Sequence, residues 1–187
     1  MQSINNRKIH FEQSKAYPLG NDNLLELVDL EPSNIFTSKK LLEVDSIDEL
    51  LDRNGRGIML FLTENENTGH WIALIRKGVN LEVFDPYGNK PSEWNKKLNS
   101  VDGLNPPNGT LEKLIKDSGY KIKINKVKHQ PINDSNSATC GKHSGIRLLF
   151  HKMNLDEYNN FMKNIKKKYG IKSEDLVNAF SLSEIGK

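Results

Sequence analysis

Apolar and polar residues alternate in blocks along the chain, and the spacing within each block predicts its secondary structure. Residues 58–62 are five consecutive apolar residues, which indicates a strand covered on both faces. Residues 70–78 and 81–88 favour two more strands, joined by a turn at 77–80. This arrangement predicts an antiparallel hairpin.

A fourth strand is expected at residues 120–127, where apolar residues alternate with basic or polar ones. The solvent side of this half-exposed strand would carry Lys121, Lys123 and Asn125. Together with the helices described next, these strands predict an α+β fold. We expect a mixed, mainly antiparallel sheet packed against helices.

Two short helices are predicted in the first two thirds of the chain. Ser46 and Glu49 have the spacing of a capping box, which favours a helix over 47–53. Thr110 is expected to cap the next helix, and Gly119 to end it. The first 40 residues give a weak pattern, apart from a helical turn at 21–28.

Two further helices are predicted near the C-terminus. The first begins at Cys140, and its apolar positions recur at offsets of three, four and seven: Ile146, Leu149, Phe150 and Met153. The second runs from a cap at Asn154, with Glu157 at the box position, to a stop at Gly170. Its buried residues would be Leu155, Tyr158, Phe161, Met162 and Ile165.

Composition indicates one globular domain over residues 1–187, with 36% hydrophobic and 27% charged residues. No apolar run approaches the roughly 18 residues of a membrane-spanning helix, and the polar start lacks the apolar block of a secretory signal. We therefore expect no membrane association and no secretion. The net charge of +3 is too small to indicate a nucleic-acid partner by itself.

Cys140 is the only cysteine, so it is a buried apolar residue, a metal ligand or a reactive thiol. Its place at a helix start favours the thiolate, because unpaired N–H groups and the helix dipole stabilise an anion there. Gly141 and Gly145 indicate that another group approaches this helix closely. A zinc site of Cys140 and His143 with His129 or His151 is an alternative, although structural zinc prefers four ligands.

His70 and Asp85 are candidate partners of this thiol. Pro86 keeps Asp85 out of a helical conformation, at a strand exit where its carboxylate can leave the sheet. If Asp85 accepts the proton of one ring nitrogen of His70, the other nitrogen can face the thiol. The three residues would then supply a nucleophile, a base and a group that orients the base.

Two stretches that carry these residues, 66–88 and 136–150, resemble the adenain-like cysteine proteases. These are the capsid-maturation enzymes of adenoviruses, of virophages such as mavirus and of Polinton-type elements. SUMO-specific proteases share the order His-Trp, Asp, Cys-Gly. The resemblance covers residues 58–153, about half the chain, and the His-Trp, Asp-Pro-Tyr-Gly and Asn-Ser-Ala-x-Cys-Gly motifs are specific in combination.

The resemblance implies a role for each matching residue. His70 would be the general base, Asp85 its orienting group and Cys140 the nucleophile, with Trp71 and Gly141 in the substrate-binding cleft. The family places an oxyanion-stabilising glutamine shortly before the cysteine, where this chain has Asn133 and Asp134. The nearest glutamine is Gln130, which we expect to take this role, with Asn133 and Asn136 as substitutes. An ionised Asp134 would repel the oxyanion.

The function that the resemblance implies is a cysteine endopeptidase that cleaves viral capsid or other structural precursors after small residues, in the virion or in the host-cell cytoplasm or nucleus. Alternatives on the same fold are a deubiquitinase or SUMO-type isopeptidase and an acetyltransferase. A non-catalytic DNA-binding module would use Lys163, Lys166, Lys167 and Lys168. No cofactor or metal is required by the sequence, while DNA or an activating peptide is implied by the family.

Overall fold

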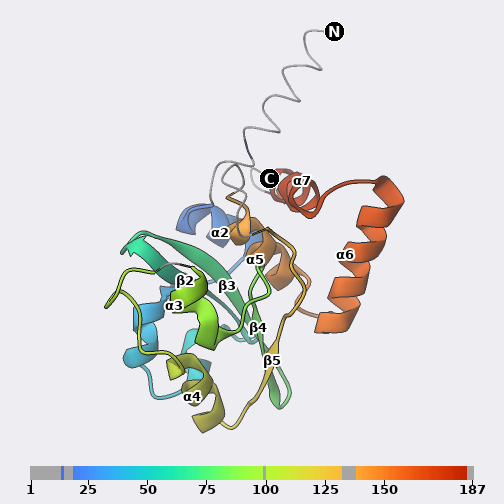
Figure 1. Cartoon of the computed structure of the whole chain (residues 1–187). Coiled ribbons are helices and arrows are strands. Elements are labelled where there is room, and N and C mark those ends of the chain that lie inside the picture. The colour runs from blue at the N-terminus through green and yellow to red at the C-terminus, as the bar shows by residue number, and fades with distance from the viewer. Residues whose placement is uncertain (1–13, 15–18, 99, 132–137, 185–187) are drawn as a thin grey trace.

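A five-stranded mixed sheet forms the centre of the protein, with helices on both of its faces (Figure 1). The computed structural model describes residues 14, 19–98, 100–131 and 138–184. The strands, in their spatial order, are β1 (Ile35–Thr37), β2 (Arg56–Asn65), β3 (Thr68–Lys77), β4 (Asn80–Phe84) and β5 (Lys121–Ile124). This arrangement is the α+β architecture expected from the sequence.

The helices are α2 (Asn21–Val28), α3 (Trp94–Lys97), α4 (Thr110–Asp117), α5 (Cys140–Leu149), α6 (Leu155–Tyr169) and α7 (Ser173–Glu184). Short 3₁₀ turns are η1 (Pro32–Asn34), η2 (Ser38–Leu42), η3 (Ile47–Leu50) and η4 (Pro91–Glu93). No helix in the described part of the chain is long and apolar enough to cross a membrane.

Antiparallel pairing joins the central strands β2, β3 and β4, whereas the short edge strands β1 and β5 pair in parallel with their neighbours. The predicted hairpin of β3 and β4 is confirmed. Lys77 pairs with Asn80, so only Gly78 and Val79 form the turn, and Gly78 adopts a φ of 53°. The hairpin register fixes the relative positions of the two strand ends at the site described below.

The sheet separates two hydrophobic cores. One lies against α2, α5, α6 and α7, and the other lies against η2, η3, α3 and α4. Strand β2 contributes to both, because alternate residues point to opposite faces. Ile58 and Leu60 belong to the first core, while Met59 and Phe61 belong to the second. This explains the continuous apolar run that predicted a strand covered on both faces.

Two of the predicted helices need correction, the first in its type and its end, the second in its N-cap. Ser46 and Glu49 form the expected capping box, but the helix is a 3₁₀ turn that ends at Leu50, since Leu51 is extended and leads toward β2. Gly109, with a φ of 87°, takes the N-cap position of α4 that we expected for Thr110. Thr110 is instead the first helical residue, and its hydroxyl donates to the Pro107 carbonyl at 2.7 Å.

The prediction that Asn125 faces solvent is wrong. Strand β5 ends at Ile124, one residue earlier, and Asn125 is fully buried. Its side-chain amide donates to the carbonyl of Asp85 at 2.9 Å and to that of Val127 at 2.8 Å. Asn125 therefore connects the end of β5 to the end of β4 instead of continuing the strand pattern.

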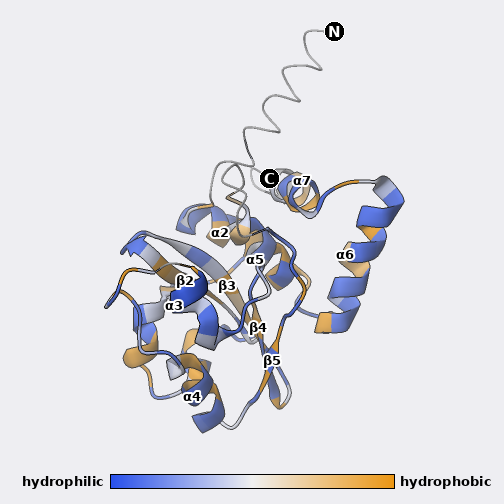
Figure 2. Ribbon diagram, in the orientation of Figure 1, coloured by the Kyte–Doolittle hydropathy of each residue, from blue (hydrophilic) through white to orange (hydrophobic). Residues whose placement is uncertain are grey.

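The predicted start of α5 at Cys140 and the cap of α6 at Asn154 are both confirmed. Gly170 ends α6 with a φ of 64°. Tyr158 and Met162 are buried as predicted, whereas Leu155, Phe161 and Ile165 are only partly buried. Most of the other residues of α6 are hydrophilic (Figure 2).

Candidate active site

Three elements bring His70, Asp85 and Cys140 to one end of the central strands. His70 lies in β3, Asp85 immediately follows β4, and Cys140 is the first residue of α5. The Nε2 atom of His70 lies 2.7 Å from Oδ1 of Asp85, and both side chains are almost completely buried. The predicted histidine–aspartate contact is therefore present.

The hairpin register explains this contact. Ala73 pairs with Phe84, so a continuation of the register places Asp85 opposite Ile72, diagonal to His70 on the same face of the sheet. The strand ends there because Pro86 has no N–H to donate to the ladder. Asp85 then stabilises the turn that follows, since its carboxylate accepts from the backbone N–H groups of Tyr87 at 2.7 Å and Asn89 at 3.3 Å.

Gly88 allows the turn after Asp85 to pack closely against the segment that follows β5. Its φ is 72°, which a residue with a side chain rarely adopts. A Cβ atom at this position would also lie only 3.1 Å from the carbonyl oxygen of Lys126. The Asp-Pro-Tyr-Gly motif thus has a structural reason for its glycine as well as for its aspartate.

The second ring nitrogen of His70 is available for Cys140. Nε2 is bonded to Asp85, so Nδ1 is the ring nitrogen that remains to interact with Cys140. Burial lowers the pKa of His70, but the charge and hydrogen bond of Asp85, together with the interaction with Cys140, outweigh it and raise the pKa to about 9. The imidazole is therefore held in its protonated form at neutral pH.

The same interaction favours the Cys140 thiolate. Burial raises the pKa of the Cys140 thiol, but the hydrogen bond and positive charge of His70 and the backbone N–H groups nearby lower it below its ordinary value. Each group thus favours the charged form of the other, in the direction of a thiolate–imidazolium pair. This arrangement is chemically capable of nucleophilic attack on an electrophilic carbon.

Tyr87 covers one face of the His70 ring. The two rings are stacked, with centroids 4.1 Å apart and planes 9° from parallel. No pattern in the sequence indicates this contact, because it depends on the hairpin register: continued by three pairs beyond Phe84, the register places Tyr87 opposite His70. The stack limits rotation of the imidazole and excludes water from that face.

Helix α5 is anchored to β3 beside the candidate base. Ser144 donates a hydrogen bond of 2.9 Å to the backbone carbonyl of Trp71. Two glycines allow close packing, because a Cβ at Gly141 would lie 3.0 Å from the Trp71 indole and one at Gly145 would lie 2.7 Å from Leu27. The groups that the two glycines were expected to admit are therefore side chains of this protein, Trp71 and Leu27.

A groove of about 640 Å³ opens beside Cys140. Trp71, Tyr87 and Gln130 line it together with Cys140, so two of the predicted binding or catalytic residues share this space with the thiol. Its apolar wall consists of Leu19, Ile35, Phe36 and Leu60, and its polar rim of Asn21, Glu66, Asn67 and Thr68. The N-terminal part of the chain, which gave little signal in the sequence, thus forms one side of the groove.

Gln130 is almost completely buried and reaches the groove from the segment after β5. The backbone N–H groups of His129 and Gln130 both donate to the Pro86 carbonyl, at 2.9 and 3.1 Å, which ties this segment to the turn after Asp85. The alternative oxyanion donors Asn133 and Asn136, as well as Asp134, lie outside the described residues.

The zinc alternative finds no support in the described part of the chain, which contains no group of three or more histidine, cysteine or acidic residues able to hold a metal ion. His143 is fully buried, and neither of its ring nitrogens has a hydrogen-bond partner among these residues. His129 bonds instead to Asn159 through Nε2, at 2.9 Å.

The fold and the site define an α+β protein with a paired thiol and imidazole in a groove. No model of a known protein family matches the sequence. The chain is similar to the uncharacterized protein V9 of Sputnik virophage, with 26% identity over 167 residues that cover 88% of this chain and 94% of V9. This similarity connects the chain with virophages and says nothing of an activity.

Proposed function

We propose that the protein is a cysteine endopeptidase with an adenain-type fold and that Cys140, His70 and Asp85 form its catalytic triad. The observation that carries this proposal is the arrangement of His70 between a buried carboxylate and the only thiol of the chain. A purely structural cysteine has no need of a base that lowers its pKa. A histidine held at 2.7 Å from a buried aspartate is also the usual way to fix the orientation of such a base.

The proposed reaction proceeds in two steps. The Cys140 thiolate attacks the carbonyl carbon of the scissile peptide bond, and the developing oxyanion accepts hydrogen bonds from Gln130 and the Cys140 backbone N–H. When the C–N bond breaks, protonated His70 transfers its proton to the leaving amine. Neutral His70 then accepts a proton from water, which attacks the acyl-enzyme and releases the carboxylic acid and the thiolate.

The residues beside Cys140 support a polypeptide substrate with a small residue at the cleavage site. Trp71 lies against Gly141, directly beside the nucleophile, so little space remains for a side chain next to the scissile bond. Together with the family resemblance, this supports cleavage after small residues such as Gly or Ala. The similarity to a virophage protein supports structural precursors of a virion as the substrates.

The direct test is incubation of the purified full-length protein with the capsid precursor encoded by the same genome, followed by mass spectrometry of the new N-termini. Cleavage after small residues is expected, and Cys140→Ala and His70→Ala should each abolish it. His151→Ala is a suitable control, because His151 lies beyond the C-terminal end of α5, at the opposite end from Cys140. Normal cleavage by Cys140→Ala would reject the proposal.

The same preparation distinguishes the alternative reactions. Release of a C-terminal tail from ubiquitin-like precursors, without cleavage of the capsid precursor, would indicate an isopeptidase. Consumption of acetyl-CoA would indicate acetyl transfer. A DNA cofactor is tested by adding DNA to the cleavage reaction at increasing salt, since binding through Lys163, Lys167 and Lys168, all exposed on α6, would weaken steeply with salt.

A further inference from the structure

The Asp85 carboxylate accepts hydrogen bonds on both of its oxygens, although it is fully buried. Oδ1 accepts from His70 at 2.7 Å and from the backbone N–H of Tyr87 at 2.7 Å. Oδ2 accepts from Nε1 of Trp94 at 2.9 Å and from the backbone N–H of Asn89 at 3.3 Å. Trp94 is therefore the closer of the two donors to the oxygen that does not contact His70.

Trp94 is held firmly in the core. Its side chain is 2% exposed, and it begins the short helix α3. The ring meets Phe61 edge to face, with centroids 5.3 Å apart. Phe61 pairs with His70 across β2 and β3, so both residues project from the same face of the sheet. Phe61, Trp94, Asp85 and His70 thus form a continuous chain of contacts.

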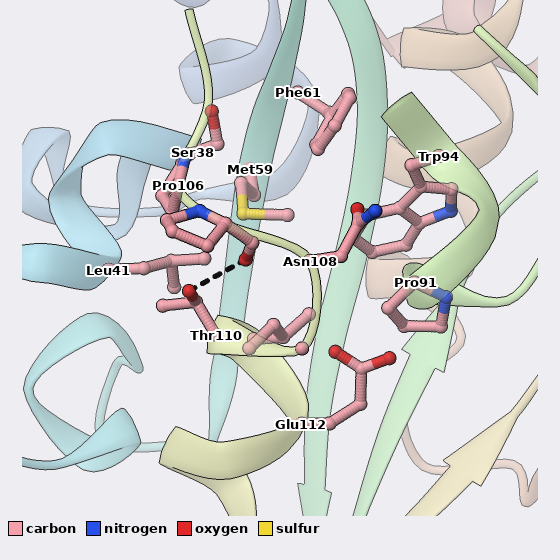
Figure 3. Close-up of a pocket in the computed structure, with 13 residues that line it drawn as sticks. Ser38, Leu41, Met59, Phe61, Pro91, Trp94, Pro106, Asn108, Thr110 and Glu112 are labelled. Atoms are coloured by element: carbon pink, nitrogen blue, oxygen red, sulfur yellow. Dashed lines mark hydrogen bonds between the residues drawn. The ribbon is translucent and has the colours of Figure 1, made fainter. Parts of the chain in front are cut away.

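The cavity beside the Trp94 indole is too small for a ligand. The cavity lined by Trp94 and Pro91 on one side and by Leu41 and Pro106 on the other has a volume of about 20 Å³ (Figure 3). This is room for one water-sized molecule. Packing against these walls, and not an occupant of the cavity, keeps Trp94 in place.

We propose that Trp94 is a positioning residue for the triad, a role that rests on the proposed function. Its indole N–H fixes the rotation of the Asp85 carboxylate about the Cβ–Cγ bond, so that Oδ1 remains directed at Nε2 of His70. Without this donor, Oδ2 would retain only the longer bond from Asn89, and a buried carboxylate oxygen would be poorly compensated. The carboxylate would then rotate or recruit water, and the imidazolium beside Cys140 would lose part of its stabilisation.

The test compares Trp94→Phe with Phe61→Leu. Trp94→Phe keeps an aromatic ring in the core and removes only the donor, whereas Phe61→Leu removes the edge-to-face contact and keeps the donor. The rate of Cys140 alkylation by iodoacetamide is measured against pH, because it reports the thiolate without any peptide substrate. Peptide cleavage is measured in parallel.

Trp94→Phe is expected to shift the midpoint of alkylation upward by about one pH unit and to lower kcat/KM about tenfold, as for loss of a hydrogen bond to a charged group. Phe61→Leu should lower the melting temperature and leave the midpoint unchanged. A Trp94→Phe midpoint equal to that of the unmodified protein would overturn the inference and leave the proposed function intact. A normal thiol midpoint in the unmodified protein would overturn both.

A measurement on the unmodified protein decides the question if Trp94→Phe does not fold. The chain has two tryptophans, so its nitrogen NMR spectrum contains two indole N–H signals, and Trp71→Phe assigns them. The Trp94 signal should be shifted downfield and should change with the pH of the His70–Cys140 titration. A signal that is insensitive to this titration would contradict the proposed role.

Discussion

Gly141 lies directly against the indole of Trp71, so that a Cβ at position 141 would be 3.0 Å from Cδ1 of that ring. The residue after the candidate nucleophile and the residue after the candidate base are therefore in contact. This contact sets the distance between α5 and β3 at the groove, since the indole forms part of the groove wall.

Gly141→Ala is expected to displace Trp71 by a few tenths of an ångström and to lower kcat/KM about tenfold, because small misplacements of binding groups are costly in catalysis. Gly145→Ala is the matched control on the same helix. Its Cβ would meet the flexible end of Leu27, away from the groove, so thermal stability should change and kcat/KM should not. Equal kinetic effects of the two variants would contradict this prediction.

Replacement of Gln130 tests the oxyanion donor. Gln130→Ala should lower kcat by about 10²–10³-fold with little change in KM, which is the usual effect of removing one such donor. The rate of Cys140 alkylation should stay unchanged, since thiolate formation does not involve the oxyanion. If kcat falls less than threefold, the donor is another residue, and Asn133 and Asn136 are then the positions to replace.

The buried ion pair of Glu82 and Arg147 should be important for stability. The guanidinium donates to both carboxylate oxygens at 2.7 and 2.8 Å and connects α5 to β4. Arg147→Met leaves Glu82 buried without its partner and is expected to lower the free energy of unfolding by about 3–5 kcal/mol. Lys40→Met removes the exposed pair with Glu43 and should cost less than about 1 kcal/mol. Denaturant titration of both variants measures the difference, and similar losses would show that burial of the first pair does not matter.

The structure also predicts acid sensitivity. Burial, followed by the charges of His129, Lys166 and His70, lowers the pKa of His143 well below its ordinary value of 6.5. Burial is also the main reason that the pKa of His129 falls to about 4. Because the unfolded chain binds these protons more readily, the stability that the neutral histidines contribute is complete above pH 6.5 and is lost as the pH falls toward 4.

Each of these histidines should remove up to about 1.4 kcal/mol of unfolding free energy per pH unit within that window. His143→Phe keeps a flat ring and removes the titrating group, so the slope should become smaller. The slope is measured by denaturant titration between pH 7 and 4.5. His151→Phe is the comparison variant: burial also lowers the pKa of this half-exposed ring, but less strongly than that of His143, so the slope should fall by less. An unchanged slope in His143→Phe would contradict the prediction, because it would show that His143 takes up no additional proton on unfolding in this pH range.

The residues predicted for the site each have a local signal in the sequence. Cys140 precedes a helical apolar stripe, Asp85 precedes a proline, and His70 begins an apolar run. These signals predicted the elements and the contact between His70 and Asp85. They do not determine how the three side chains are arranged in space, because this arrangement depends on the strand register and on the packing of α5 against β3.

Residues whose contacts join segments that are distant in the sequence have no local signal of this kind. Trp94 lies in a short helix after a proline, where nothing indicates a bond to Asp85. Asn125 continues the polar alternation of β5 and is nevertheless buried, because tertiary hydrogen bonds outweigh the strand pattern. Strand β1 contains three residues, fewer than a periodicity requires to be recognised, and its parallel pairing with β2 is set by distant parts of the chain.

Helix α5 supplies the thiol from the C-terminal third of the chain, whereas the β3–β4 hairpin supplies the imidazole and the carboxylate earlier. During synthesis a growing polypeptide that has already paired these strands has no sulfur beside its histidine. Under the proposed function, the thiol becomes reactive only after the ribosome has delivered α5 and the Glu82–Arg147 pair has fixed this helix against β4.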